Sequence, residues 1–162
     1  MFPIVPANSA AVSGNQEGIF GFGDTGGGDS GYQSITNLVS NTGVVSTDVA
    51  GVGTVRRYLA ACEYGEDKGI FGFGSKAPGG STYSSETNLV SSAGVVASDQ
   101  AATTGTGRRS PAACSYGDDK GIFGFGYNNV KNSMTNLVSN TGVVASDVSS
   151  VGDVRYSLAA CE

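Results

Sequence analysis

The chain has 162 residues, of which only 14 % are charged, and nine basic against fourteen acidic side chains give a formal net charge of -5. This balance argues against a broad electrostatic surface for nucleic acid. The composition includes 26 glycines but no histidine and no tryptophan, which is unusual for a helical or α/β domain and favours closely packed sheets.

At the start of the chain, residues 1–6 lack the basic start and the long apolar centre of a signal peptide. No later run approaches the roughly 18 to 20 apolar residues that a membrane helix needs. We therefore expect a soluble, unprocessed chain without membrane insertion and without a nucleic-acid partner.

The next segment, Gly-Ile-Phe-Gly-Phe-Gly, occurs three times and repeats every 51 or 52 residues. The copies begin at Gly18, Gly69 and Gly121. In the second copy, strand alternation predicts that Phe71 and Phe73 share one face. Ile70 and Gly72 then form a nearly flat opposite face, which a neighbouring sheet can approach closely.

Each copy is followed by the same series of elements. A variable loop rich in Gly, Ser and Asn comes first, at residues 24–34, 75–86 and 127–134. Two short strands joined by a turn follow, the first reading Thr-Asn-Leu-Val and the second Gly-Val-Val. A polar stretch then leads to an Ala-Ala-Cys strand at residues 60–62, 112–114 and 159–161, and residues 10–12 take this place in the first unit. Each unit is predicted to contain four short strands and no helix.

This period defines one repeat domain over residues 1–162. It divides into unit 1 (10–59), unit 2 (60–111), unit 3 (112–157) and an overhanging strand (158–162). Repeats of about 40 to 50 residues with strand-like composition are typical of propeller blades and related radial β-architectures. We therefore predict an all-β fold of three four-stranded propeller blades.

The order of motifs resembles a known family. At residues 108–126 an Arg precedes small residues, the turn Tyr-Gly-Asp-Asp-Lys and the strand Gly-Ile-Phe-Gly-Phe-Gly, and a loop and two further strands follow. This order resembles the kelch repeat of galactose-oxidase-like propellers, over residues 10–161. The near-identical copies are also similar to highly repetitive propeller-type sequences in virion proteins of environmental bacteriophages, a resemblance that carries no site residues.

The number of units poses a geometric problem, because propellers typically close with four to eight blades and this chain encodes three. Head-to-tail association of two chains would give a six-bladed ring, in which the overhanging strand pairs with the partner or completes the third blade of its own chain. The alternative is a monomeric β-trefoil or β-prism built from three four-stranded units. We favour the dimeric ring, and the mass in solution distinguishes the two.

Two charged positions recur once per unit, and we expect both to be structural. Arginines that can fix one blade to the next through carbonyls or carboxylates lie at Arg56, Arg108 and Arg155. Aspartates that are expected to form turns follow the Val-Val strand at Asp48, Asp99 and Asp147. The functional alternatives are an anionic ligand for the arginines and a cation such as calcium for a ring of the aspartates.

The remaining chemistry-bearing residues give no catalytic, metal or cofactor site. Cys62, Cys114 and Cys161 have no Cys-x-x-Cys spacing, so we expect small core residues and not metal ligands or a disulfide. The Gly-x-Gly spacings lack the following helix of a dinucleotide-binding unit.

Tyrosines in the variable loops are the candidate ligand-binding residues, because Tyr beside Asn, Ser and Gly is the composition of recognition surfaces. They are Tyr32, Tyr83 and Tyr127. We expect a non-enzymatic binding or structural assembly module, a homo-oligomer on a virion or extracellular surface, with glycans or other surface proteins as partners. The alternatives are a multivalent carbohydrate-binding lectin and a subunit of a propeller-fold enzyme.

Overall fold

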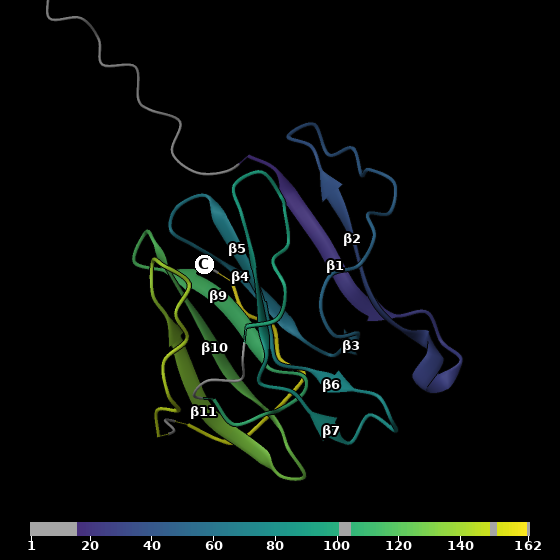
Figure 1. Cartoon of the computed structure of the whole chain (residues 1–162). Coiled ribbons are helices and arrows are strands. Elements are labelled where there is room, and N and C mark those ends of the chain that lie inside the picture. Colours follow the sequence, from purple (N-terminus) through teal and green to yellow (C-terminus); the bar gives the residue numbers. More distant parts are fainter. Residues whose placement is uncertain (1–15, 101–104, 150–151, 162) are drawn as a thin grey trace, which may run out of the picture.

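A computed structural model describes residues 16–100, 105–149 and 152–161. Within these ranges the chain forms strands and one short 3-10 turn, which confirms the expected all-β fold (Figure 1). No helix of the described residues is long and apolar enough to cross a membrane. In chain order the elements are β1 (Gly18–Asp24), η1 (Gly28–Gly31), β2 (Tyr32–Val39), β3 (Arg56–Arg57), β4 (Ala60–Tyr64), β5 (Lys68–Gly72), β6 (Ser75–Lys76), β7 (Thr82–Tyr83), β8 (Thr87–Val90), β9 (Ala112–Tyr116), β10 (Lys120–Tyr127) and β11 (Lys131–Val138).

Each unit contributes one main antiparallel sheet in which strands close in sequence pair, and a fourth, small sheet joins β3, β6 and β7. The strand orders are β1-β2 in unit 1, β4-β5-β8 in unit 2 and β9-β10-β11 in unit 3. In every unit the segment after Thr-Asn-Leu-Val returns beside it through two isolated bridges, such as Thr36 with Val49 and Val39 with Val45. The expected fourth strand is thus present as isolated bridges. The first strand expected for unit 1, at residues 10–12, lies outside the described residues.

The polar linkers contact both of the units that they join. In the first linker, β3 pairs with β6 and β6 pairs with β7, which gives a small sheet with two strands of unit 2, and Arg57 forms an ion pair with Asp24 of unit 1 at 2.5 Å. In the second linker, the backbone N–H of Arg108 donates to the Ser84 carbonyl of unit 2 at 3.3 Å, while Arg109 pairs with Tyr127 of unit 3. Each of these linkers therefore ties one unit to the next.

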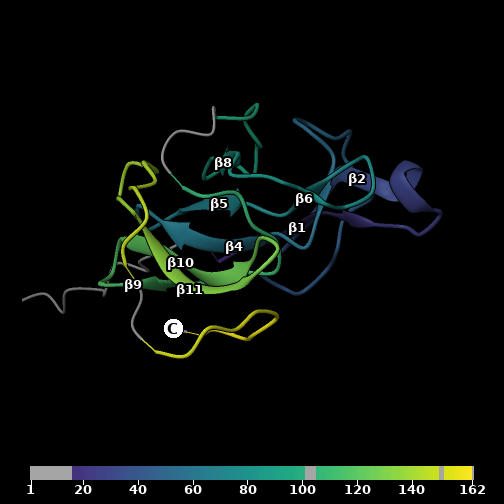
Figure 2. The same ribbon diagram turned by 90° about the horizontal axis from the view of Figure 1, so that it is seen from below.

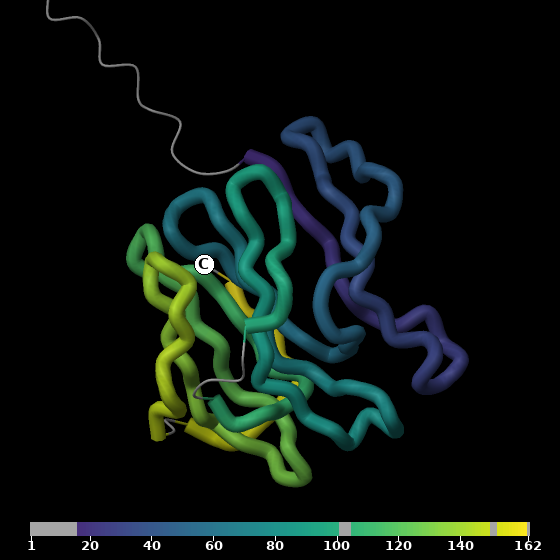
Figure 3. Tube along the Cα trace, in the orientation of Figure 1, coloured from purple at the N-terminus to yellow at the C-terminus, as the bar shows by residue number. Residues whose placement is uncertain are grey.

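The main sheets of the three units follow one another as successive layers. Figure 2 shows β4 and β5 above the sheet of β9, β10 and β11, with the yellow C-terminal segment on the opposite side of that sheet. The tube in Figure 3 shows that each unit turns back on itself before the chain moves to the next one. Within the described ranges none of these sheets closes into a barrel.

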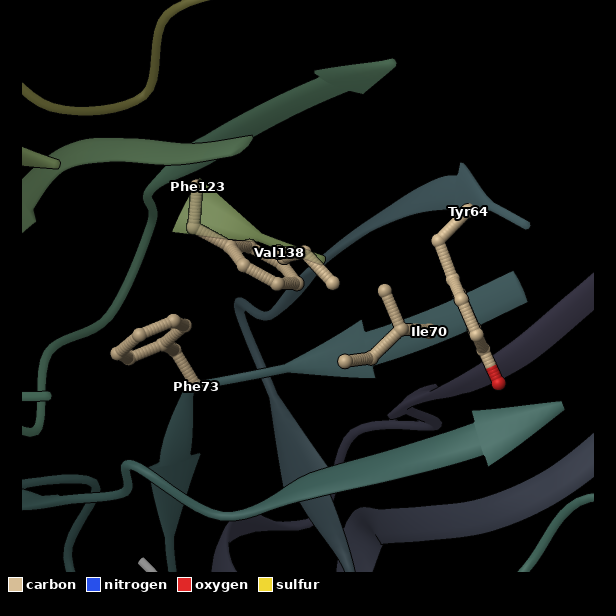
Figure 4. Close-up of a cluster of buried hydrophobic side chains, with 5 residues drawn as sticks. All are labelled: Tyr64, Ile70, Phe73, Phe123 and Val138. Atoms are coloured by element: carbon tan, nitrogen blue, oxygen red, sulfur yellow. The ribbon is translucent and has the colours of Figure 1, made fainter. Parts of the chain in front are cut away.

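The hydrophobic core lies between the units. One cluster joins unit 2 to unit 3 and consists of Tyr64, Ile70, Phe73, Phe123 and Val138 (Figure 4). A second cluster joins unit 1 to unit 2 and contains Phe22, Phe71 and Val90. Since burying one such aromatic or aliphatic side chain contributes about 1.5–3 kcal/mol, stacking of neighbouring units stabilises each of them.

The placement of the two phenylalanines of each repeat differs from the expected alternation. Phe71 packs toward unit 1, whereas Phe73 packs toward unit 3. The cause is a backbone irregularity, because Phe73 has φ 65°, and its equivalents Phe22 and Phe125 have φ 64° and 63°. Such left-handed conformations are uncommon outside glycine. This kink turns the second phenylalanine to the opposite face, so both faces of a unit carry an aromatic ring.

Candidate functional site

The best-defined polar constellations lie at the two junctions between units, and each is centred on a buried arginine. Arg56 occupies the junction between units 1 and 2, and Arg108 the junction between units 2 and 3. Both side chains are 0 % exposed. A fully buried guanidinium requires hydrogen-bond partners, and both arginines find them in the next unit.

Arg108 makes contacts on both sides of its junction. Its Nε donates to the Phe125 carbonyl at 2.6 Å, and Nη2 donates to Asn136 Oδ1 at 2.7 Å. On the side of unit 2 its guanidinium carbon lies 4.0 Å from the centroid of the Phe73 ring. Burial lowers the pKa of Arg108 to about 10, with the nearby carboxylate of Asp147 opposing this shift, so the side chain remains charged at neutral pH.

Arg56 makes the same asparagine and aromatic contacts one unit earlier, but among the described residues its buried Nε has no hydrogen-bond partner. Nη1 donates to the Glu86 carbonyl at 2.6 Å, and Nη2 donates to Asn88 Oδ1. Its guanidinium carbon lies 4.9 Å from the centroid of the Phe22 ring. Burial lowers the pKa of Arg56 as well, against the charges of Asp99 and Glu86.

A threonine of each linker binds the recurrent aspartate of the next unit. Thr106 Oγ1 donates to Asp147 Oδ2 at 2.5 Å and its backbone N–H donates to the same oxygen at 3.0 Å. Thr54 binds Asp99 in the same way, at 2.7 Å and 2.9 Å. Burial raises the pKa of Asp147, but hydrogen bonds from Thr106 and Asn136 and the charge of Arg108 lower it overall. Asp99 has a lowered pKa for the same reasons.

An aromatic ring packed on a glycine forms the apolar half of each junction. A Cβ atom placed on Gly72 of unit 2 would lie 2.8 Å from Phe123 Cζ of unit 3. One unit earlier, a Cβ on Gly21 would lie 3.0 Å from Phe71 Cζ. Such short contacts leave no room for a side chain, which gives a physical reason for glycine at this position.

A leucine packed on a second glycine completes the contact. Leu89 of unit 2 lies against Gly142 of unit 3, where an added Cβ would be 2.7 Å from Leu89 Cδ2. Leu38 of unit 1 lies against Gly94 of unit 2 in the same way. Both junctions therefore use one recurring set of arginine, threonine, phenylalanine and leucine contacts.

The outer face of unit 3 carries the arginine, the leucine and the ring-facing glycine of this contact set. Arg155 covers the ring of Phe125, with the guanidinium carbon 4.3 Å from the ring centroid. Leu137, the equivalent of Leu38 and Leu89, is 40 % exposed. Within the described ranges, a Cβ on Gly124 would meet only Thr135 Cγ2, at 3.4 Å. Unlike its equivalents, Gly124 has no aromatic ring packed on it there.

The outer face of unit 1 carries the partners of these residues, namely the phenylalanine, the leucine-facing glycine and the asparagine with its aspartate. Phe20, the equivalent of Phe71 and Phe123, is 62 % exposed. A Cβ on Gly43 would meet no heavy atom of the described chain within 4 Å. Asn37 is partly exposed, and its Nδ2 donates to Asp48 Oδ1 at 2.8 Å. The residues of the two end faces thus correspond to the two sides of the internal junctions, except that Asp153 takes the place of the linker threonine.

The three candidate ligand-binding tyrosines lie in different environments. Tyr32 is buried, with 3 % exposure, and Arg57 covers its ring at 4.5 Å. Tyr83 and Tyr127 lie together, with ring centroids 6.2 Å apart, and the ring of the exposed Tyr156 lies 5.4 Å from that of Tyr127. The structure therefore forms an aromatic group from Tyr83, Tyr127 and Tyr156, and separates Tyr32 from it.

The cysteines line a cavity of about 400 Å³ beside β4 and β9. Cys62 and Cys114 are half-buried and Cys161 is exposed, and all three are free thiols. Burial raises the pKa of the Cys62 thiol to about 12, although a backbone hydrogen bond from Ile122 opposes the shift. Across the described residues no three His, Cys, Asp or Glu side chains gather as metal ligands.

Sequence reasoning pointed to the arginines and aspartates of this site but missed their partners. Asn88 and Asn136, both 0 % exposed, and the linker threonines Thr54 and Thr106 complete each polar group. The available signal was that Asn recurs in every Thr-Asn-Leu-Val segment.

Together, the fold and the junctions define an all-β repeat protein whose units pack through one recurring contact set. No known family model matches the chain, and no curated protein matches it significantly.

Proposed function

We propose that the chain is a non-enzymatic assembly module whose three units are propeller blades, and that two copies close head to tail into a six-bladed ring. Propellers typically contain four to eight blades, so two copies with three units each give a number of blades within this range. A contact between unlike faces closes into a ring when the rotation fits and otherwise forms an open filament. In either assembly the module would present several equal surfaces, which suits a virion or extracellular setting.

The complementarity of the two end faces carries this proposal. Phe20 is 62 % exposed on unit 1, whereas its equivalents Phe71 and Phe123 are 5 % and 0 % exposed inside junctions. On unit 3, Gly124 offers the position that Gly21 and Gly72 offer to those rings. Burying Phe20 on Gly124 of a second copy would contribute about 1.5–3 kcal/mol per joint.

Sedimentation equilibrium or native mass spectrometry tests the assembly. We expect twice the chain mass for the natural sequence and the single chain mass for Phe20→Ala. Phe20 is exposed, so Phe20→Ala should leave the circular dichroism spectrum of the chain unchanged. A natural chain that stays monomeric at high concentration would contradict the ring and favour a monomeric trefoil or prism.

Carbohydrate binding is a second candidate function, and the aromatic group of Tyr83, Tyr127 and Tyr156 favours it. The Tyr127 ring also stacks with Arg109, whose guanidinium carbon lies 5.0 Å from the ring centroid. Exposed aromatic rings beside polar loop residues are typical of recognition surfaces.

A glycan array tests this second function. We expect binding that disappears in Tyr83→Ala and Tyr156→Ala and persists in Tyr116→Ala, an exposed tyrosine elsewhere on the surface. Absence of binding by the natural chain across the array would count against a lectin.

A further inference from the structure

The joint between two copies would differ from the internal junctions at one residue, Asp153. Two positions before the junction arginine, the first and second linkers carry Thr54 and Thr106, and the third carries Asp153. The threonine hydroxyl donates a hydrogen bond to the aspartate of the next unit. An ionised carboxylate cannot donate one, because it only accepts.

Residues 153–155 make the same contacts as residues 106–108 of the second linker, so Asp153 occupies the place of Thr106. The Nη1 atom of Arg155 donates to the Asp153 carbonyl at 3.5 Å, as Nη1 of Arg108 does to the Thr106 carbonyl at 3.2 Å. The backbone hydrogen bonds of the two arginines also correspond. The N–H of Arg155 donates to the Asn132 carbonyl at 3.4 Å, as the N–H of Arg108 donates to the Ser84 carbonyl at 3.3 Å. The carbonyl of Arg155 accepts from Gly126 N–H at 3.0 Å, as the carbonyl of Arg108 accepts from Gly74 N–H at 2.8 Å.

The acid that would receive this linker is Asp48 on the outer face of unit 1. Asn37 Nδ2 donates to Asp48 Oδ1 at 2.8 Å, just as Asn136 Nδ2 donates to Asp147 Oδ1 at 2.9 Å. Asp48 is therefore held as Asp147 is held. If the end faces meet as the internal faces do, the carboxylate of Asp153 faces the carboxylate of Asp48 in the next copy.

We propose that this pair of opposed carboxylates makes the joint between copies weaker than the internal junctions, so that the second copy binds reversibly and more tightly in salt. The inference rests on the proposed head-to-tail assembly. Arg155 would neutralise only one of the two carboxylates, whereas at the second junction Arg108 faces the single carboxylate of Asp147, with Nη1 3.9 Å from Oδ1. One negative charge is left over at the joint. Like charges placed opposite each other across an interface oppose association, and salt screens them.

Sedimentation equilibrium of the natural chain, Asp153→Thr and Asp153→Asn tests this proposal. Asp153→Thr restores the residue of the other linkers, and we expect its dimer dissociation constant to fall at least about tenfold. Asp153→Asn removes the charge without supplying a threonine, and its dimer dissociation constant should fall by a smaller factor. Raising the sodium chloride concentration from about 0.05 M to 0.5 M should tighten the natural dimer more than the Asp153→Thr dimer.

Thr106→Asp supplies the matched internal control, because it places two carboxylates at the second junction. The urea concentration at the midpoint of unfolding should be lower for this variant than for the natural chain, and added salt should reduce the difference. If the natural chain dimerises and Asp153→Thr dimerises no more tightly, the charge inference is wrong while the assembly stands. If neither chain associates in any salt, both the inference and the proposed assembly are wrong.

Discussion

At the scale of single residues, the arginine of each linker shows how one sequence position acquires different roles. Arg108 is fully buried and donates to a carbonyl and an amide oxygen of the next unit, whereas Arg155 is exposed and covers a ring of its own unit. The sequence predicted a structural role from recurrence alone. It could not predict the difference in burial, since that depends on whether a further unit follows in space.

Replacing these arginines should therefore have unequal effects on the single chain. Arg108→Ala leaves Asn136 Oδ1 and the Phe125 carbonyl without a donor, and we expect the free energy of unfolding to fall by about 3 kcal/mol. Arg155→Ala should change it by less than about 1 kcal/mol. Urea unfolding at low protein concentration, where association is minimal, measures both values. Equal losses would contradict the assigned role of Arg108.

The junction aspartates should make the fold sensitive to acid. Asp99 and Asp147 have pKa values in the folded chain below the ordinary value of 3.8, although burial opposes the shift. Their contribution to stability is therefore complete above the unfolded pKa and is lost as the pH falls through the folded pKa.

The double variant Asp99→Asn and Asp147→Asn checks this dependence. We expect its free energy of unfolding to decline less between pH 5 and pH 2 than that of the natural chain, because two of the linked protonations are removed. Urea titrations at each pH give the comparison. An identical decline would show that other carboxylates control acid unfolding.

At the scale of elements, strand identity was predictable from the sequence, but the direction of the side chains was not. Strands form in units 2 and 3 as expected, at the Gly-Ile-Phe-Gly-Phe-Gly, Thr-Asn-Leu-Val and Ala-Ala-Cys segments. Alternation failed at Phe73, because the positive φ at this residue interrupts the period of two. Neither composition nor spacing marks a phenylalanine for that conformation, and the signal was only that a glycine follows it in every copy.

Matched glycine substitutions test the packing of neighbouring sheets. Gly72→Ala forces a methyl group against Phe123, so we expect a loss of about 1–3 kcal/mol in the free energy of unfolding. Gly124→Ala meets only Thr135 at 3.4 Å within the described chain and should cost less than about 0.5 kcal/mol. Thermal and urea unfolding of dilute samples measure both. A large loss for Gly124→Ala would mean that its surroundings are already filled.

At the scale of the whole molecule, the position of the core matters most. In the described part of the chain the two buried clusters lie between units, so every unit depends on a neighbour for stability. The sequence predicted repeats that stack, since the period and the small residues both pointed to it. It left open whether the chain closes on itself, because that depends on the angle between successive units, which no residue pattern encodes.

Concentration should therefore affect thermal stability. If the outer faces of units 1 and 3 are buried on association, mass action raises the midpoint of thermal unfolding as the protein concentration increases. We expect a shift between about 1 µM and 100 µM for the natural chain and none for Phe20→Ala. Differential scanning fluorimetry at several concentrations provides the measurement. A midpoint independent of concentration would indicate a self-sufficient monomer.

The opposite orientation of Phe71 and Phe73 gives every unit a front and a back. A front fits only a back, so identical units cannot join front to front. Duplicating one internal unit in the gene would lengthen the series while leaving both terminal surfaces unchanged. Arrays of four or five units are therefore accessible to engineering by copying a single segment of the coding sequence, without redesign of any contact.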